Sequence, residues 1–242
     1  MKLSHYSHRL LFCVKVPNIK IDKQAAKYID CTIMRFFILF QLLAASLFAY
    51  VPKDYSYLIG SPGFTDQLFQ MHFKLYEGYV KNTNDLLDKL ENIDPSSYEY
   101  GALKRRLGWE FDGMKLHELY FDNLGGVVPI DKKSPLYLAL VQQFGSFEKW
   151  KSGFIGVGTM RGIGWALLYY DSEEKKLINT WINEHDGGHL VKGVPILIMD
   201  VFEHAYMPQF GLDRLKYIDA FFNNINWPLA NSRYTENQKN LQ

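Results

Sequence analysis

Four side chains in this sequence of 242 residues have the types and positions needed to build a metal site. Asp200 directly follows the apolar run from Val194 to Met199, and His204 comes four residues later. Burying an ionised carboxylate is costly unless a charge or a hydrogen-bond donor compensates it. Since His204 can direct an imidazole nitrogen to the same point in space, this pair predicts one half of a metal site.

Two further histidines could supply the other half, because His72 and His117 each lie in a segment with helical periodicity. A single histidine on an apolar helix face is usually only a core residue. Two of them on facing helices, together with Asp200 and His204, make a set of three imidazoles and one carboxylate. Such a set suits a first-row redox metal such as Fe or Mn. Zinc could also bind there, but the sequence lacks the His-Glu-x-x-His pattern of many zinc hydrolases.

A second histidine-containing motif, His185-Asp-Gly-Gly-His189, lies between two strand-like runs. It could form a metal loop of its own, but glycine-rich polar loops commonly carry histidine, so the signal is weak. We interpret His185 instead as a hydrogen-bond donor beside the metal site.

The elements that position these residues fall into two groups. Helical spacing of apolar residues over 65–91 and 98–124, with a short break between them, predicts an antiparallel helical hairpin. Two shorter helices are expected at 134–144 and 146–157, and a closing helix at 212–226. Strands are expected at 165–170, 176–182 and 194–202, with a hairpin turn beginning at Asp171. The predicted fold class is α+β, an N-terminal antiparallel α-hairpin followed by an α/β domain with a small three-stranded antiparallel sheet.

The expected domain organisation has four parts. These are a signal-like or disordered N-terminal segment at 1–50, an α-hairpin domain at 58–126, an α/β C-terminal domain at 133–230 and a polar tail at 231–242.

The apolar run 36–51 is short for a membrane span and fits the hydrophobic region of a secretory signal, with cleavage near Ala45 or Ala49. Met34 could be an alternative start. We expect export to the periplasm or the exterior, with the cytoplasm as the alternative, and membrane contact only if this segment is uncleaved.

Composition restricts the chemistry further. Both cysteines, Cys13 and Cys31, lie in the N-terminal segment, so the body cannot use a thiolate ligand or a disulfide. The first 49 residues hold seven of the 27 basic and two of the 26 acidic residues, which leaves the remainder with a net charge of −4. This balance gives no reason to expect nucleic-acid binding.

The segment Asp200-Val-Phe-Glu-His-Ala-Tyr206 resembles the C-terminal signature of iron/manganese superoxide dismutases. Four other motifs of that family occur in the expected order between residues 60 and 230: Gly113-Met-Lys-Leu-His117, Phe144-Gly-Ser-Phe, Gly162-Ile-Gly-Trp-Ala-Leu-Leu and Asn226-Trp227. The resemblance implies His72, His117, Asp200 and His204 as ligands of one Fe or Mn ion per subunit. It implies that Trp165 and Trp227 occupy aromatic positions of the family, and that Phe121 and Phe202 replace tryptophans.

The resemblance also implies the disproportionation of superoxide to oxygen and hydrogen peroxide, with Tyr79 and His185 ordering the proton-donating solvent. Glu203 would contact the partner subunit's ligand histidine at His204, which predicts a homodimer. The alternative is a non-catalytic structural protein that retains the superoxide dismutase fold.

The sequence departs from the family at several positions. Tyr79 lies seven residues after His72 instead of eight, which is compatible with a regular helix that lacks a π-bulge. A gap-free alignment would instead put Met71 at the ligand position, where a thioether suits Fe or Mn poorly. At the dimer-facing channel, Leu75 or Tyr76 and Met207 replace the usual His-Tyr pair. Gly113 stands where some members have a glutamine, and His185 where others have a histidine, a combination typical of iron-dependent or metal-tolerant members.

Overall fold

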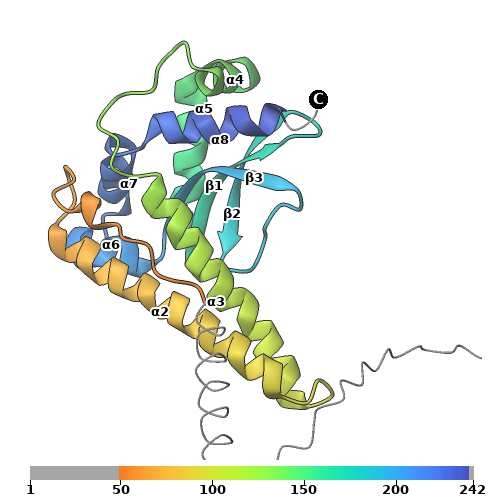
Figure 1. Ribbon diagram of the computed structural model, residues 1–242. Helices are drawn as coiled ribbons and strands as arrows, with labels where there is room; N and C mark the ends of the chain where they lie inside the picture. Colours follow the sequence, from red (N-terminus) through yellow and green to blue (C-terminus); the bar gives the residue numbers. More distant parts are fainter. Residues whose placement is uncertain (1–48, 240–242) are drawn as a thin grey trace, which may run out of the picture. The chain divides into compact units, whose positions relative to one another are not determined.

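The computed structural model describes residues 49–239 (Figure 1). The expected signal segment, Met34 and both cysteines lie outside the described residues. Within residues 49–239, no helix combines the length and the apolar character needed to cross a membrane.

The chain first forms a short 3₁₀ helix and two long α-helices, and then a pair of shorter ones. Their bounds are η1 Ser56–Leu58, α2 Asp66–Asn92, α3 Tyr98–Asp122, α4 Pro135–Phe144 and α5 Phe147–Gly158. The remaining elements are β1 Gly164–Asp171, β2 Lys176–Asn183, β3 Gly193–Asp200, α6 Glu203–Phe210, α7 Arg214–Asn223 and α8 Trp227–Lys239. This order confirms the predicted α+β class.

Each of the first four α-helices begins after a hydroxyl side chain that caps it. Thr65, Ser97, Ser134 and Ser146 accept hydrogen bonds from backbone N–H groups three residues downstream. Such caps satisfy donors that the first turn leaves free, and this explains why the starts of these helices could be predicted from the sequence.

The three strands form an antiparallel sheet in the order β2-β1-β3, as expected. Seven of the eight residues of β1 are buried, so both faces of the central strand are covered. Helix α5 packs against β1 and β2, while α3 and α8 contact β3. In Figure 1, α2 and α3 form a hairpin that lies beside the sheet. One continuous hydrophobic core joins the hairpin to the α/β part.

The register of the sheet brings the two parts of the expected site together. Trp165 at the start of β1 pairs with Asp200 at the end of β3 and with Ile182 near the end of β2. A β-bulge in the β1–β3 pairing lies between Leu168 and Tyr169. Three strand ends therefore meet at one end of the sheet. They carry Trp165, Asp200 and the start of the His185 loop.

The C-terminal part differs from the prediction at several places. The strand predicted to reach residue 202 ends at Asp200, and an unpredicted helix, α6, begins at Glu203. The Phe202 N–H donates to Asp200 Oδ1 at 2.9 Å, which turns the chain out of the sheet immediately after the strand.

The closing helix is shorter than expected, and α8 follows it through the segment interpreted as a polar tail. Helix α8 is polar on average, and its buried residues Trp227, Ala230 and Tyr234 form only a narrow stripe at helical spacing. That stripe is too narrow to stand out in a sequence pattern.

Candidate metal centre

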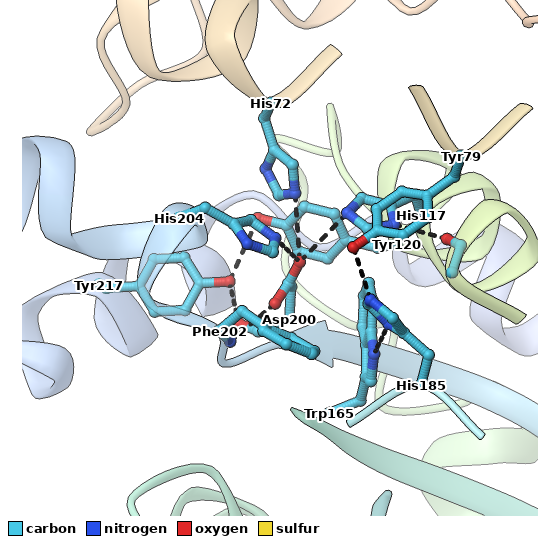
Figure 2. A network of polar contacts seen from close by, with 11 residues as sticks. His72, Tyr79, His117, Tyr120, Trp165, His185, Asp200, Phe202, His204 and Tyr217 are labelled. Atoms are coloured by element: carbon cyan, nitrogen blue, oxygen red, sulfur yellow. Dashed lines mark hydrogen bonds and ion pairs between the residues drawn. The ribbon is translucent and has the colours of Figure 1, made fainter. Parts of the chain in front are cut away.

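The four predicted ligand residues converge on one buried point (Figure 2). Helix α2 supplies His72, α3 supplies His117, the end of β3 supplies Asp200, and the first turn of α6 supplies His204. Their ligand atoms all lie within 4.8 Å of one another. Asp200 Oδ2 is 3.1 Å from His72 Nε2, 3.0 Å from His204 Nε2 and 3.6 Å from His117 Nε2.

His72 is the residue of helix α2 that faces this cluster. It is 2% exposed, whereas the preceding Met71 is 50% exposed. Tyr79 lies on the same side of the helix, because seven residues of a regular α-helix make almost two full turns. The hairpin therefore directs both His72 and Tyr79 inward without a π-bulge, and Met71 lies outside the cluster.

The proton on His117 can be placed from its surroundings. His117 Nδ1 is 2.5 Å from the backbone oxygen of Gly113, and a carbonyl oxygen can only accept. Nδ1 therefore carries the hydrogen and Nε2 presents a lone pair to the centre of the cluster. Within the described residues, His117 Nε2 is buried and has no hydrogen-bond partner. A buried lone pair without a donor fits a bound cation.

The surroundings also set the protonation states that a metal requires. Burial lowers the pKa of His72 and holds that of His117 well below the usual value. Burial alone would raise the pKa of Asp200, but the attraction of His204 and the hydrogen bonds of His204 and His72 hold that pKa well below its usual range. Neutral imidazoles and an ionised carboxylate are the forms that bind metal ions, so the donor set fits Fe or Mn.

Asp200 is held in place by bonds besides those to the histidines. Its Oδ1 accepts the Phe202 N–H, and its backbone oxygen accepts the Tyr217 hydroxyl hydrogen at 2.6 Å. No sequence motif links Tyr217 to Asp200, because Tyr217 lies in a separate helix, α7.

A hydrogen-bonded chain from Trp165 through His185 to Tyr79 lies beside the cluster (Figure 2). The Trp165 indole N–H donates to His185 Nδ1 at 3.1 Å, and His185 Nε2 is 2.7 Å from the Tyr79 hydroxyl. Burial lowers the pKa of His185 to about 4, so its ring is neutral near pH 7. Because Nδ1 accepts from the indole, Nε2 carries the hydrogen and donates it to Tyr79. The Tyr79 hydroxyl then keeps its own hydrogen available for another acceptor.

Aromatic rings surround the cluster at the positions expected from the sequence. Ring centroids lie 5.0 Å apart for His72 and Phe121, 5.0 Å for His117 and Trp165, and 5.2 Å for Phe202 and His204. Phe121 and Phe202 thus line the site where tryptophans were expected in the family. Trp109, which belongs to none of the sequence motifs, lies edge-on to His185, with the ring centroids 4.8 Å apart.

Leu75 or Tyr76 and Met207 lie at the positions where the family usually has the His-Tyr pair of the channel. The Tyr76 hydroxyl donates to Glu118 Oε1 at 3.3 Å and accepts the backbone N–H of Lys53 at 3.0 Å. Tyr76 is buried, while Met207 on α6 is 40% exposed. Tyr76 therefore ties the segment before α2 to the hairpin.

Comparisons with known proteins identify the family. The sequence model described as "Iron/manganese superoxide dismutases, C-terminal domain" matches residues 132–233. The "Superoxide dismutase [Fe]" of Cupriavidus metallidurans is 34% identical over 178 residues, which cover 71% of this chain and 89% of that protein. The chain belongs to the iron/manganese superoxide dismutase family.

Other members of the family have a similar sequence identity to this protein. The "Superoxide dismutase [Fe]" of Saccharolobus solfataricus is 31% identical over 194 residues, covering 75% of this chain and 90% of that protein. The "Superoxide dismutase [Mn] 2" of Haloferax volcanii is 32% identical over 189 residues, covering 76% and 94%. The relatives carry either metal in their names, in agreement with the expected Fe or Mn.

Proposed function

We propose that this protein is a superoxide dismutase, with Fe or Mn held by His72, His117, Asp200 and His204. The observation that carries the proposal is the buried set of three imidazoles and one carboxylate, in which the lone pair of His117 Nε2 has no donor among the described residues. The bound metal would supply a centre that alternates between M(III) and M(II), taking one electron from one superoxide to give oxygen and giving it to the next, which with two protons becomes hydrogen peroxide.

The residues of the chain would set the charge around that metal. Asp200 brings one negative charge, and the neutral His72 and His117 bring none, so a bound M(III) keeps a positive charge that attracts a small anion. The aromatic rings packed around the imidazoles favour a substrate as small as superoxide over an organic molecule.

Tyr79 and His185 are the proposed catalytic residues. Burial raises the pKa of Tyr79, so its hydroxyl keeps its hydrogen. Because His185 donates to the Tyr79 oxygen, the hydroxyl hydrogen can point to solvent or to reduced substrate at the cluster. In this role Tyr79 holds the proton, and His185 with Trp165 fixes the direction in which it is offered.

Metal content and superoxide dismutation, measured on the same purified samples, test this proposal. We expect about one Fe or Mn per chain and dismutation in the wild type. His72→Ala should lower the metal content about tenfold or more, because it removes a ligand. Met71→Ala should keep metal and activity, since Met71 is half exposed and lies outside the cluster.

Two results would contradict the proposal. A wild-type protein that binds neither metal, or binds one and does not dismutate superoxide, favours the alternative of a non-catalytic structural protein. Loss of metal in Met71→Ala but not in His72→Ala would show that Met71 occupies the ligand position, as in the gap-free alignment.

We further propose a homodimer in which Glu203 contacts His204 of the partner subunit. His204 directs Nε2 to Asp200, and its side chain is 28% exposed, so part of the ring is accessible to a partner subunit. Sedimentation velocity should show a dimer for the wild type and weakened association for Glu203→Ala. Glu91→Ala, at an exposed position near the end of α2, is the matched control. A monomeric wild type would contradict this proposal.

Export through cleavage of the N-terminal segment is also proposed. Asn84 Nδ2 donates to the backbone oxygen of Tyr50, and the Tyr50 N–H donates to Asn84 Oδ1, both at 2.9 Å. Cleavage after the candidate Ala49 would leave these two hydrogen bonds of Tyr50 intact. Mass spectrometry of the protein from a fractionated bacterial host should find an N-terminus near Tyr50 in the periplasm or medium. An intact chain in the cytoplasm or the membrane fraction would contradict cleavage and export.

A further inference from the structure

The loop between β2 and β3 carries a second histidine, His189, that does not belong to the metal cluster. It lies four residues after His185, and the backbone between them contains Gly187 and Gly188. Glu184 and Gly188 adopt positive φ angles of 55° and 100°. A glycine-containing loop of this kind needs anchors if it is to hold the His185 ring in one orientation.

His189 contacts the backbone of His185 directly. His189 Nε2 is 2.8 Å from the His185 carbonyl oxygen, and the Tyr169 hydroxyl is 2.9 Å from His189 Nδ1. A carbonyl only accepts, so Nε2 carries the hydrogen and Nδ1 accepts the Tyr169 hydroxyl hydrogen in the neutral ring. Both nitrogens are therefore used, and the orientation of the imidazole is determined.

The two histidines of the loop are held by two aromatic donors of the same strand. The Trp165 indole N–H donates to Nδ1 of His185, and the Tyr169 hydroxyl donates to Nδ1 of His189. These donors are four residues apart on β1, and alternate residues of a strand share a face. The spacing of the histidines in the loop thus matches the spacing of their donors on the strand.

Helix α3 contacts the same histidine. Asp112 Oδ2 is 3.6 Å from His189 Nε2, and Asp112 directly precedes Gly113, whose carbonyl accepts from His117. His189 accordingly lies between the strand that holds His185 and the helix that holds His117.

We propose that His189 is a positioning residue for the proton-holding pair His185 and Tyr79, acting through its bond to the His185 backbone. This inference rests on the proposed function for its effect on turnover. Its structural part does not, because the orientation and tautomer of His185 can be measured without metal.

The first test is nitrogen-15 NMR of the histidine rings in the metal-free protein. The wild type should show one His185 species, with Nδ1 unprotonated and Nε2 protonated. In His189→Ala these signals should shift or broaden, because the loop loses the bond from His189 to the His185 carbonyl and keeps only backbone bonds such as those between Asn183 and Gly187. His189→Gln should restore them, since an amide can donate to the His185 carbonyl and accept from Tyr169. Val191→Ala is the control, at a side chain of the same loop that is 93% exposed.

The second test is dismutation per bound metal in the same variants. We expect a loss of up to about tenfold in His189→Ala, the lower end of the effect of removing a hydrogen-bond partner of a metal ligand, because His189 acts through His185, and we expect recovery in His189→Gln. Tyr169→Phe removes only the hydroxyl donor and should show a smaller loss of the same kind, which keeps the test available if His189→Ala does not fold.

An unchanged His185 spectrum in His189→Ala would overturn the proposal, and so would a His189→Gln variant that behaves like the alanine variant. If the spectra change as expected but no variant or wild type dismutates superoxide, the positioning role stands and the proposed function fails.

Discussion

At the scale of single residues, hydrogen-bond direction determines what the site can do. Three of the histidines near the metal cluster have a proton position that follows from a neighbour able only to accept or only to donate. These neighbours are the Gly113 carbonyl for His117, the Trp165 indole for His185 and the His185 carbonyl for His189. As a result, His117 presents a lone pair to the centre of the cluster and His185 presents a hydrogen to Tyr79.

The lowered pKa of His185 predicts a pH dependence of stability. In the unfolded chain a histidine binds its proton near pH 6.5, whereas folded His185 does so near pH 4 because it is buried. Between these values the unfolded state holds more protons, so the free energy of unfolding falls as the pH decreases from about 6.5 to about 4. His185→Gln removes this contribution while keeping a donor and an acceptor.

Denaturant unfolding of the metal-free protein at pH 7 and pH 4.5 measures the effect. The wild type should lose roughly 1–3 kcal/mol more stability across this range than His185→Gln, because each unit of pKa shift corresponds to about 1.4 kcal/mol. Equal losses in the two proteins would show that His185 does not titrate with folding.

At the scale of elements, the absence of a side chain at Gly113 makes room for the Tyr79 ring where α2 and α3 pack together. A Cβ atom on Gly113 would lie 2.7 Å from the Tyr79 ring, which is shorter than any normal contact. The glycine on α3 thus permits the tyrosine on α2 to reach His185.

Gly113→Ala should therefore push the Tyr79 ring away from His185. We expect a loss of about 1–3 kcal/mol in stability, typical of overpacking, and a larger relative loss of dismutation than of bound metal. Gly101→Ala on the same helix is the control, because no atom lies within 4 Å of the added Cβ. Activity per metal that is unchanged in Gly113→Ala would contradict the role given to this contact.

Helix α8 is attached to the rest of the core through Arg233. Its Nη1 donates to Asn123 Oδ1 at 2.5 Å, and its Nη2 lies 3.7 Å from Asp122. Since Asn123 is buried, Arg233→Ala would leave its oxygen without that donor. We expect a loss of about 1–3 kcal/mol in denaturant unfolding. Ser232→Ala, which removes an exposed hydrogen bond to Glu236 on the same helix, should change stability little. Equal effects of the two substitutions would contradict the anchoring role of Arg233.

At the scale of the whole molecule, the segment before α2 belongs to the core. Tyr55 and Leu58 are buried, and the Tyr55 hydroxyl donates to the backbone oxygen of Glu118. The body of the protein therefore includes residues before 58, the position at which the sequence predicted the start of the hairpin domain.

Two truncations test this boundary. A chain that starts at Tyr50 should keep the thermal unfolding midpoint of the longer protein to within a few degrees. A chain that starts at Ile59 should fold poorly, because it lacks the buried Tyr55 and Leu58. If both truncated chains unfold at the same temperature, residues 50–58 contribute little to the fold.

The sequence by itself determined which residue types meet at the site and which elements carry His72, His117 and Asp200, but it did not indicate helix α6, which carries His204. Periodicity located the helical hairpin, hydroxyl caps marked where helices begin, and the Asp200 and His204 pair indicated the metal. These signals are local, so they can be recognised without neighbours from distant segments.

Only the tertiary structure decided which side of α2 faces inward, and thus that His72 and not Met71 joins the cluster. It also decided that Gly113 leaves room for Tyr79, that α8 replaces the expected tail and that His189 holds the His185 loop. Each of these depends on atoms brought together from elements far apart in the chain, where packing and hydrogen-bond direction act and sequence periodicity carries no information.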